Sequence, residues 1–375
     1  MNSLIQLRHS LHQNPEIAGE ENQTAQRILE FFKSLEPDDV IEGLGGTGLA
    51  FTFKGKKPGN RLLFRCELDA LPIKERGNPS YKSQVNGKAH LCGHDGHMAI
   101  ICGLGEKLAA KRPESGEVML LFQPAEETGE GAKRILKDPR FGFILPDFAF
   151  ALHNLPGYPL HQIITRQGTF AAGSTGVIYS FEGKTSHAAH PDHGINPASA
   201  ISQLVLDIPT VIEGLNGFAL ATVIQIALGS QAFGTSAGSG SLSLTLRAFD
   251  QDVLEKLKSQ MEEKANSLAK AHGLKLAISY QESFAVSTNH PKAAAIAETA
   301  FQSLGLEIVE NSDPFRWSED FGLFSQYCPS YLFGLGAGEH CPQLHEPTYD
   351  FPDELIETGI RVFERIMRDQ SNGKS

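Results

Sequence analysis

Four short apolar runs, each followed by acidic residues or histidine, most constrain the fold of this 375-residue sequence. They lie in "RLLFRCELDALP", "GEVMLLFQPAEE", "DFAFALHNLP" and "PSYLFGLGAGEH". Continuous apolar runs of this length are typical of strands buried on both faces, as in a parallel sheet covered by helices. Helical patterns such as "GHMAIICGLGEKLAAKR" and "EGAKRILKD" lie between the runs. The sequence therefore predicts an α/β domain with a mostly parallel, helix-covered central sheet.

A different pattern interrupts this alternation between residues 173 and 284. Four segments ("STGVIYSFEG", "LATVIQIALGS", "SLSLTLRAFD" and "LKLAISYQES") have antiparallel-type strand patterning, and two helical stretches lie among them. We expect an inserted, smaller α+β domain at 173–284, with a four-stranded antiparallel sheet and two helices. The larger domain is then discontinuous and consists of residues 1–172 and 285–375.

Composition and the N-terminal sequence limit the class of protein. An apolar content of 41% and a charged content of 21% are typical of a globular chain, and the net charge of −11 favours neither nucleic acid nor a membrane surface as partner. No apolar run approaches the roughly 18 residues that span a bilayer, and the N-terminus lacks a secretory signal pattern. Five cysteines without disulfide-type spacing indicate a reduced, cytoplasmic setting in which Cys92 is available as a thiol.

Candidate ligands follow the predicted strands at one edge of the sheet. Ligand sites in such sheets form outside the carboxyl ends of the strands, so we expect these side chains to converge. The segment "HLCGHDGH" adds Cys92 and His94, which can face one ion together only from a looped backbone, and Gly93 makes that loop accessible. Taken alone, a histidine after a strand is more commonly a hydrogen-bonded loop residue than a metal ligand. Paired glutamates are more commonly solvated, and a lone cysteine is more commonly buried and inert. Their convergence favours a metal site.

Five candidate metal ligands result: Cys92, His94, Glu127, His153 and His345. Five ligands are too many for a closed structural zinc site, which uses four. A set of five suits two neighbouring divalent cations, with a thiolate that can bridge them and with open positions for a substrate.

The chain also resembles the M20 metallopeptidase clan, in particular its amidohydrolase branch of aminoacylases, hippurate hydrolases and auxin-conjugate hydrolases. The resemblance extends from residue 11 to residue 351, in the family's order. It rests on "LHQNPE", "LDALP", "HLCGHDGH", "LLFQPAEETGEGA", "LHNLP", "GKTSHAAHP", "SEDFG" and "LHEPTYDF".

The resemblance implies a role for each matching residue. Cys92 is the bridging thiolate, and Glu126 is the general base. Asp69 supports a metal ligand from behind. His187 contributes to the oxyanion site, in some relatives from the neighbouring subunit. Arg247 binds the substrate carboxylate.

The implied function is that of a metal-dependent amidohydrolase that cleaves N-acyl amino acids through attack by an activated water. The resemblance also implies two divalent cations per chain, Zn²⁺ or Mn²⁺, with Co²⁺ or Ni²⁺ as alternatives. The inserted domain would be a lid with hinges near Ala172 and Ser283, and would be the site of homodimerisation. A dipeptidase or carboxypeptidase of the same clan is the alternative. A non-catalytic metal-binding protein and a structural zinc site are less favoured, because Glu126 lies beside a complete ligand set.

Several positions depart from the family pattern. Gly234 stands where relatives usually have asparagine, Leu244 where they have glycine, Glu67 where they have aspartate, and Asp192 where they have histidine. None of these positions is a candidate ligand. We therefore expect the departures to alter lid contacts and substrate preference rather than metal binding.

Overall fold

The computed structural model describes residues 1–371, and the chain divides into two compact units. Unit 1 contains residues 1–170, 287–314 and the chain from Asp320 onward, and unit 2 contains Ala171–Val286 and Phe315–Glu319. Residues 173–284 remain our proposed bounds for the inserted domain, and the rest of the chain our proposed bounds for the catalytic domain.

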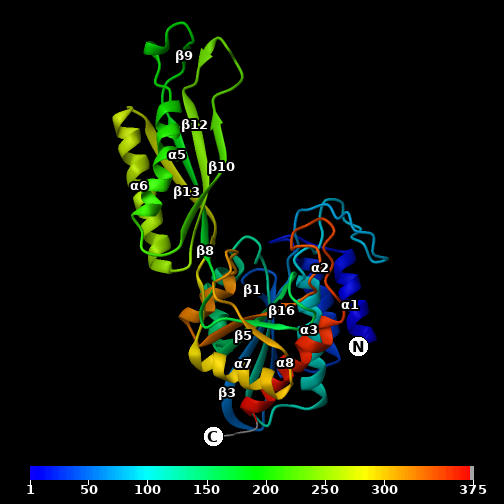
Figure 1. Ribbon diagram of the computed structural model, residues 1–375. Helices are drawn as coiled ribbons and strands as arrows, with labels where there is room; N and C mark the ends of the chain where they lie inside the picture. Colours follow the sequence, from blue (N-terminus) through cyan, green and yellow to red (C-terminus); the bar gives the residue numbers. More distant parts are fainter. Residues whose placement is uncertain (372–375) are drawn as a thin grey trace. The chain divides into compact units, whose positions relative to one another are not determined.

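An eight-stranded sheet forms the centre of unit 1 (Figure 1), in the order β1-β2-β4-β3-β5-β16-β6-β15. The four central strands, β4, β3, β5 and β16, pair in parallel, whereas β1, β2 and the β6–β16 pair are antiparallel. The strands are β1 (Asp39–Leu44), β2 (Gly48–Lys54), β3 (Lys57–Glu67), β4 (Ser115–Gln123), β5 (Phe148–Leu155), β6 (Ile163–Thr165), β15 (Ile308–Glu310) and β16 (Ser330–Gly336).

The four apolar runs of the sequence are β3, β4, β5 and β16, and they are direct neighbours in the sheet. Most of their residues are buried because helices cover the sheet, which confirms the predicted fold class. Since the strands are parallel, their carboxyl ends lie at the same edge of the sheet.

Helices pack on this sheet through aromatic and aliphatic side chains. Phe32 of α2 stacks on Phe51 of β2 with 3.9 Å between ring centroids, and Phe363 of α8 lies 5.1 Å from Phe64 of β3. The helices of unit 1 are α1 (Asn2–Gln13), α2 (Asn22–Lys33), α3 (His94–Ala110), α4 (Gly131–Lys137), α7 (Pro291–Ser303) and α8 (Leu355–Ser371), with 3₁₀ turns η1 (Pro139–Ile144) and η3 (Asp320–Gln326). Among residues 1–371, no helix is both long and apolar enough to cross a membrane.

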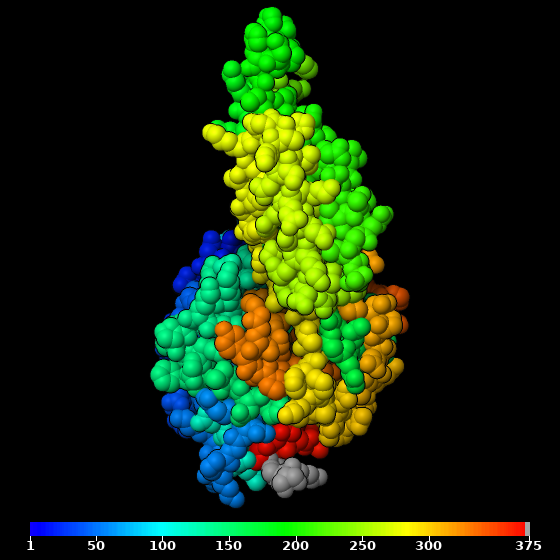
Figure 2. Space-filling view, turned by 90° about the vertical axis from the view of Figure 1, so that its left-hand side faces the viewer, coloured from blue at the N-terminus to red at the C-terminus, as the bar shows by residue number. Residues whose placement is uncertain are grey.

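Unit 2 contains a four-stranded antiparallel sheet in the order β10-β12-β8-β13 and two helices, α5 and α6, which confirms the predicted α+β composition. The helices cover one face of the sheet, and Figure 2 shows α6 in yellow on that side. The elements are β8 (Gly173–Glu182), β9 (Ser186–His187), η2 (Pro191–His193), α5 (Ala198–Glu213), β10 (Ala219–Leu228), β11 (Thr235–Ser236), β12 (Ser239–Ala248), α6 (Gln251–Ala271) and β13 (Lys275–Phe284). Two short strands, β7 (Gly168–Ala171) and β14 (Ser287–Asn289), pair with each other where the chain enters and leaves this unit.

Candidate metal centre

The carboxyl edge of the central strands carries most of the candidate site. Asp69 follows β3, Glu126 and Glu127 follow β4, His153 lies near the end of β5, and His345 lies in the loop after β16. The parallel pairing of these strands therefore brings residues that are far apart in sequence to one edge, as the sequence predicted.

The start of α3 supplies the two remaining candidate ligands. Gly93 is the N-cap of the helix, with a left-handed φ of 93°, so that Cys92 precedes the helix and His94 is its first residue. A Cβ atom on Gly93 would lie 2.3 Å from Oδ1 of Asn154, so this close approach requires glycine. The looped backbone expected from the Cys92–His94 spacing is present.

The five candidate ligands gather in two triads. The first comprises Cys92, His94 and His153, and the second Cys92, Glu127 and His345; within each triad the potential ligand atoms lie within 4.8 Å of one another. Cys92 Sγ is 3.5 Å from His153 Nε2, and His345 Nε2 is 3.6 Å from Glu127 Oε2. Cys92 is common to both triads, which is the arrangement that a thiolate bridging two cations requires.

The orientation of His94 and the charge around Cys92 both suit divalent cations. Nδ1 of His94 is hydrogen-bonded to the main-chain oxygen of Asp69 at 2.8 Å, and the buried Nε2 has no hydrogen-bond partner among residues 1–371. Metal-binding histidines are commonly held through their other ring nitrogen in this way. Burial and the carboxylates of Glu127 and Glu126 raise the pKa of the Cys92 thiol. Bound cations would lower this pKa and so favour the thiolate.

Asp69 holds the turn that carries the two glutamates. Its carboxylate accepts hydrogen bonds from the main-chain N–H groups of Glu126, at 3.1 Å, and Glu127, at 2.9 Å. The turn is tight, because Ala125 has a φ of 50°. Burial raises the pKa of Asp69 to about 8 although these N–H groups lower it, and a nearby cation would also lower it. The side chain of Glu126 is thereby placed beside the first triad, with Oε2 4.0 Å from His94 Nε2.

Two buried residues next to the triads had no predicted role. His97 lies one turn after His94 on α3, and its Nδ1 is hydrogen-bonded to Glu67 Oε2 at 2.7 Å. Burial opposes the charge of Glu67, but the Arg65 guanidinium and the His97 imidazole lower its pKa well below the usual range. The i, i+3 spacing was the available signal, since it places His97 on the same helix face as His94.

His187 and Arg247 belong to unit 2. His187 is exposed on β9, and Arg247 is half-buried on β12, where its Nη1 donates to the main-chain oxygen of Arg316 at 2.9 Å and to Ser318 Oγ at 3.1 Å. Arg247 pairs with Ser174 at one end of the sheet, whereas His187 follows the opposite end of β8 (Figure 1). More than about 25 Å of strand separates them. One small substrate therefore cannot contact both residues of the same copy.

Gly234, one of the expected departures from the family pattern, lies beside His187. Its main-chain oxygen accepts a hydrogen bond from Ala188 N at 2.9 Å, and the next residue, Thr235, pairs with His187. A Cβ atom on Gly234 would meet nothing within 4 Å. A side chain would therefore fit at position 234.

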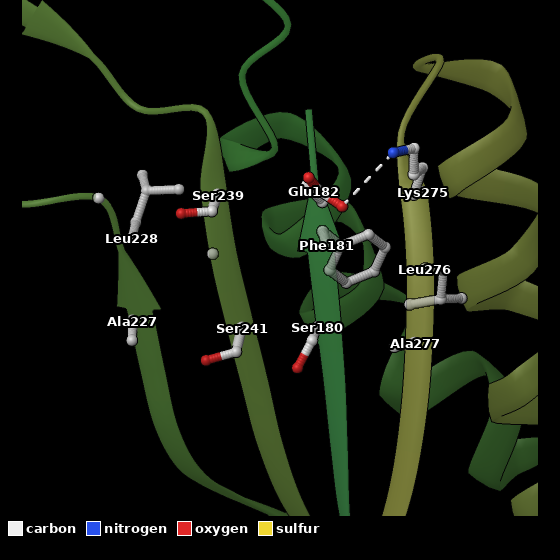
Figure 3. Close-up of a pocket in the computed structure, with 12 residues that line it drawn as sticks. Ser180, Phe181, Glu182, Ala227, Leu228, Ser239, Ser241, Lys275, Leu276 and Ala277 are labelled. Carbon is white, nitrogen blue, oxygen red and sulfur yellow. Dashed lines mark ion pairs between the residues drawn. The ribbon is translucent and has the colours of Figure 1, made fainter. Parts of the chain in front are cut away.

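A shallow hollow lies on unit 2, on the face of the sheet away from its helices (Figure 3). Short side chains such as Ser180, Ser241 and Ala277 line it, and at its rim Lys275 Nζ lies 3.7 Å from Glu182 Oε2. Its charged groups are exposed and paired with each other, so the hollow lacks the converging titratable groups of the triads.

Comparison with known proteins identifies the family. The model of peptidase family M20/M25/M40 matches residues 63–369, most of the chain. The chain belongs to this family. As an M20 protein it is a hydrolase, a metal-dependent amidohydrolase, and the resemblance found in the sequence is confirmed.

Relatives of the M20 chain match it over nearly its full length. An N-acetyldiaminopimelate deacetylase of Shouchella clausii is 31% identical, covering 90% of each chain. That of Oceanobacillus iheyensis is 29% identical, covering 96% of this chain and 98% of the relative. Among solved structures, a dinuclear metal-binding M20 peptidase of Bacillus subtilis aligns with a TM-score of 0.83 at 23% identity, covering 99% of this chain and 98% of the other. At such identity the structural likeness shows the fold alone.

Proposed function

We propose that the chain removes the acyl group from N-acyl amino acids at a centre of two divalent cations, held by Cys92, His94, Glu127, His153 and His345. The observation that carries this proposal is the pair of triads that share Cys92, with Glu126 directly beside them. The mixed sulfur, nitrogen and oxygen donors suit Zn²⁺, with Mn²⁺ second and Co²⁺ or Ni²⁺ as further candidates.

Glu126 is the proposed general base. The cations, when bound, would acidify a water molecule and polarise the amide carbonyl. Glu126 accepts the proton of that water during attack and later donates it to the departing amine. The Asp69 carboxylate keeps Glu126 in place through the main-chain hydrogen bonds of the turn. His187 is proposed to donate to the oxyanion.

The substrate class follows from Arg247 and from the names of the relatives. A guanidinium can bind a free carboxylate in a bidentate way, which favours acylated amino acids over internal peptide bonds. The relatives are named for removing an acetyl group from an acylated diamino dicarboxylic acid. We therefore propose N-acetyl amino acids as substrates, with N-acetyldiaminopimelate as the first compound to test.

Metal analysis combined with a substrate panel tests the function. The panel contains N-acetyldiaminopimelate, other N-acetyl amino acids, N-benzoyl amino acids and dipeptides, assayed with Zn²⁺, Mn²⁺, Co²⁺ and Ni²⁺. We expect about two cations per chain and preference for N-acetyl compounds. Preference for dipeptides would establish the peptidase alternative, and absence of turnover with two cations bound would contradict hydrolysis of these classes.

The substitution Glu126→Gln tests the assigned base. It keeps the shape of the side chain but removes its basicity, so turnover should fall about 10²- to 10⁴-fold while metal content stays at the wild-type value. Glu130→Gln, a nearby partly exposed glutamate, is the control and should keep wild-type turnover. Near-normal turnover of Glu126→Gln would show that the base is another group.

A homodimer through the inserted unit is part of the proposal. β10 is an edge strand of its sheet, and Val223, Ile224, Ile226 and Leu228 on it are exposed apolar residues, with Ile224 63% exposed. An uncovered apolar edge strand is a template for pairing with a second copy. The distance between His187 and Arg247 also favours a site completed by the His187 of another copy.

The five free cysteines support a reduced, cytoplasmic setting.

A further inference from the structure

A fully buried arginine that the sequence did not single out is hydrogen-bonded to the start of α3, the helix that carries His94. Arg8 projects from α1, and its side chain has no exposed surface. Nε donates to Asp95 Oδ2 at 2.9 Å, Nη1 donates to Asp353 Oδ1 at 2.9 Å and to the hydroxyl of Tyr81 at 3.1 Å, and Nη2 donates to Asp350 Oδ1. One guanidinium thus joins three carboxylates from two separate segments.

Both segments carry candidate cation ligands. Asp95 directly follows His94 in the first turn of α3. Asp350 and Asp353 lie five and eight residues after His345, in the chain between β16 and α8. We propose that Arg8 is a positioning residue of the cation centre, which holds the His345 segment against the start of α3. This inference rests on the proposed function.

The two segments differ in how else they are held. α3 is buried along most of its length, so His94 has support that does not involve Arg8. Residues 337–354 contain no helix or strand, and His345 has a strained φ of 68°. Main-chain hydrogen bonds from His345 N to Leu91 O, 2.8 Å, and from Arg76 N to Pro347 O, 2.6 Å, attach this segment. Its two aspartate side chains are held by Arg8, with further contacts from His9 and Tyr81. Loss of Arg8 should therefore affect the triad of His345 more than that of His94.

The geometry requires a guanidinium rather than a simple positive charge. Arginine presents donors in several directions of one plane, whereas a lysine ammonium is a compact point charge on a flexible stem. Lysine at position 8 keeps the positive charge, but its single nitrogen cannot occupy the three positions from which Nε, Nη1 and Nη2 of Arg8 reach the three aspartates. Tyr81 supports the same arrangement, because its hydroxyl donates to Asp350 Oδ2 at 2.7 Å. Substitution of Arg8 should therefore perturb the contacts between the two segments strongly, and substitution of Tyr81 should perturb them mildly.

The test is cation binding by the full chain, measured separately for each cation. Wild type, Arg8→Lys and Tyr81→Phe are stripped of metal and titrated with Co²⁺ in competition with a chelator, while the visible absorption of bound Co²⁺ is recorded. Arg61→Lys is the matched control, because Arg61 also bridges a carboxylate, that of Glu117, and two main-chain oxygens, but near the amino end of β3, away from the site.

For Arg8→Lys we expect the first Co²⁺ to bind as in wild type and the second about 10- to 100-fold more weakly, with activity recovered at high Co²⁺. Tyr81→Phe should show a smaller shift of the second cation, and Arg61→Lys no shift. If the folded Arg8→Lys variant binds both cations as tightly as wild type, or binds both equally more weakly, the inference is overturned. If Arg8→Lys does not fold, an unchanged second cation in Tyr81→Phe would overturn it. A wild-type chain that binds fewer than two cations would contradict the proposed function itself.

Discussion

At the scale of single residues, Asp69 links two parts of the candidate site. Its carboxylate orders the turn of Glu126 and Glu127, and its main-chain oxygen orients the His94 ring. The resemblance assigned it a supporting role, which these contacts favour. The sequence could not indicate that one residue would serve both parts, because the main-chain contact leaves no pattern in residue types.

His12 gives a prediction on the pH dependence of stability. Burial opposes its charge, but hydrogen bonds to Asp95, at 2.9 Å, and Glu75 raise its pKa from 6.5 to about 9. A raised pKa stabilises the fold fully below pH 6.5, and the stabilisation is lost as pH rises toward 9. The free energy of unfolding should fall by roughly 2 to 3 kcal/mol over this range through His12 alone.

Urea unfolding at pH 6.5 and pH 9, with chelator present throughout, measures this effect. The difference in unfolding free energy between the two pH values should be smaller in His12→Gln than in wild type. Equal differences in the two proteins would show that His12 does not carry the dependence.

At the scale of elements, the central part of the sheet could be predicted and its margins could not. Strands buried on both faces have a continuous apolar sequence, so β3, β4, β5 and β16 were visible. β6 and β15 have three residues each, too few to show a period.

Arg8 was missed for another reason: its burial depends on carboxylates up to 345 residues away, and local sequence does not reveal such partners.

The turn into α3 gives a prediction at this scale. Gly93→Ala would place a methyl group against Asn154 and strain a left-handed φ. We expect a loss of about 2 to 3 kcal/mol of stability and weaker metal binding, because Cys92 and His94 flank the position. Gly87→Ala is the control: φ is 77°, but nothing lies within 4 Å of the added atom, so about 1 kcal/mol should be lost and metal binding kept.

Urea unfolding and metal analysis of both variants make the comparison. If the Gly93→Ala variant binds metal normally and is no less stable than the Gly87→Ala variant, the close approach to Asn154 is unimportant.

At the scale of the whole molecule, the proposed dimer can be tested by mixing two inactive variants. Glu126→Gln lacks the base and His187→Ala lacks the oxyanion donor. If His187 serves the site of a second copy, mixed dimers contain one site with both groups, and an equal mixture after subunit exchange should regain up to about a quarter of wild-type activity.

Light scattering provides the control, with Ile224→Lys expected to weaken the dimer through the apolar edge of β10. A monomeric wild type, or no recovered activity in mixtures shown to contain mixed dimers, would contradict the arrangement.

The strand order has a consequence for how the protein is made. β6 is synthesised before the inserted unit, yet its sheet neighbours β15 and β16 follow that unit in the chain. A nascent chain on the ribosome therefore cannot join β6 to the sheet until about 330 residues have emerged. His345 emerges later still. Capture of the second cation, at the triad of His345, should thus be among the last events of biogenesis, after the inserted unit has had time to fold.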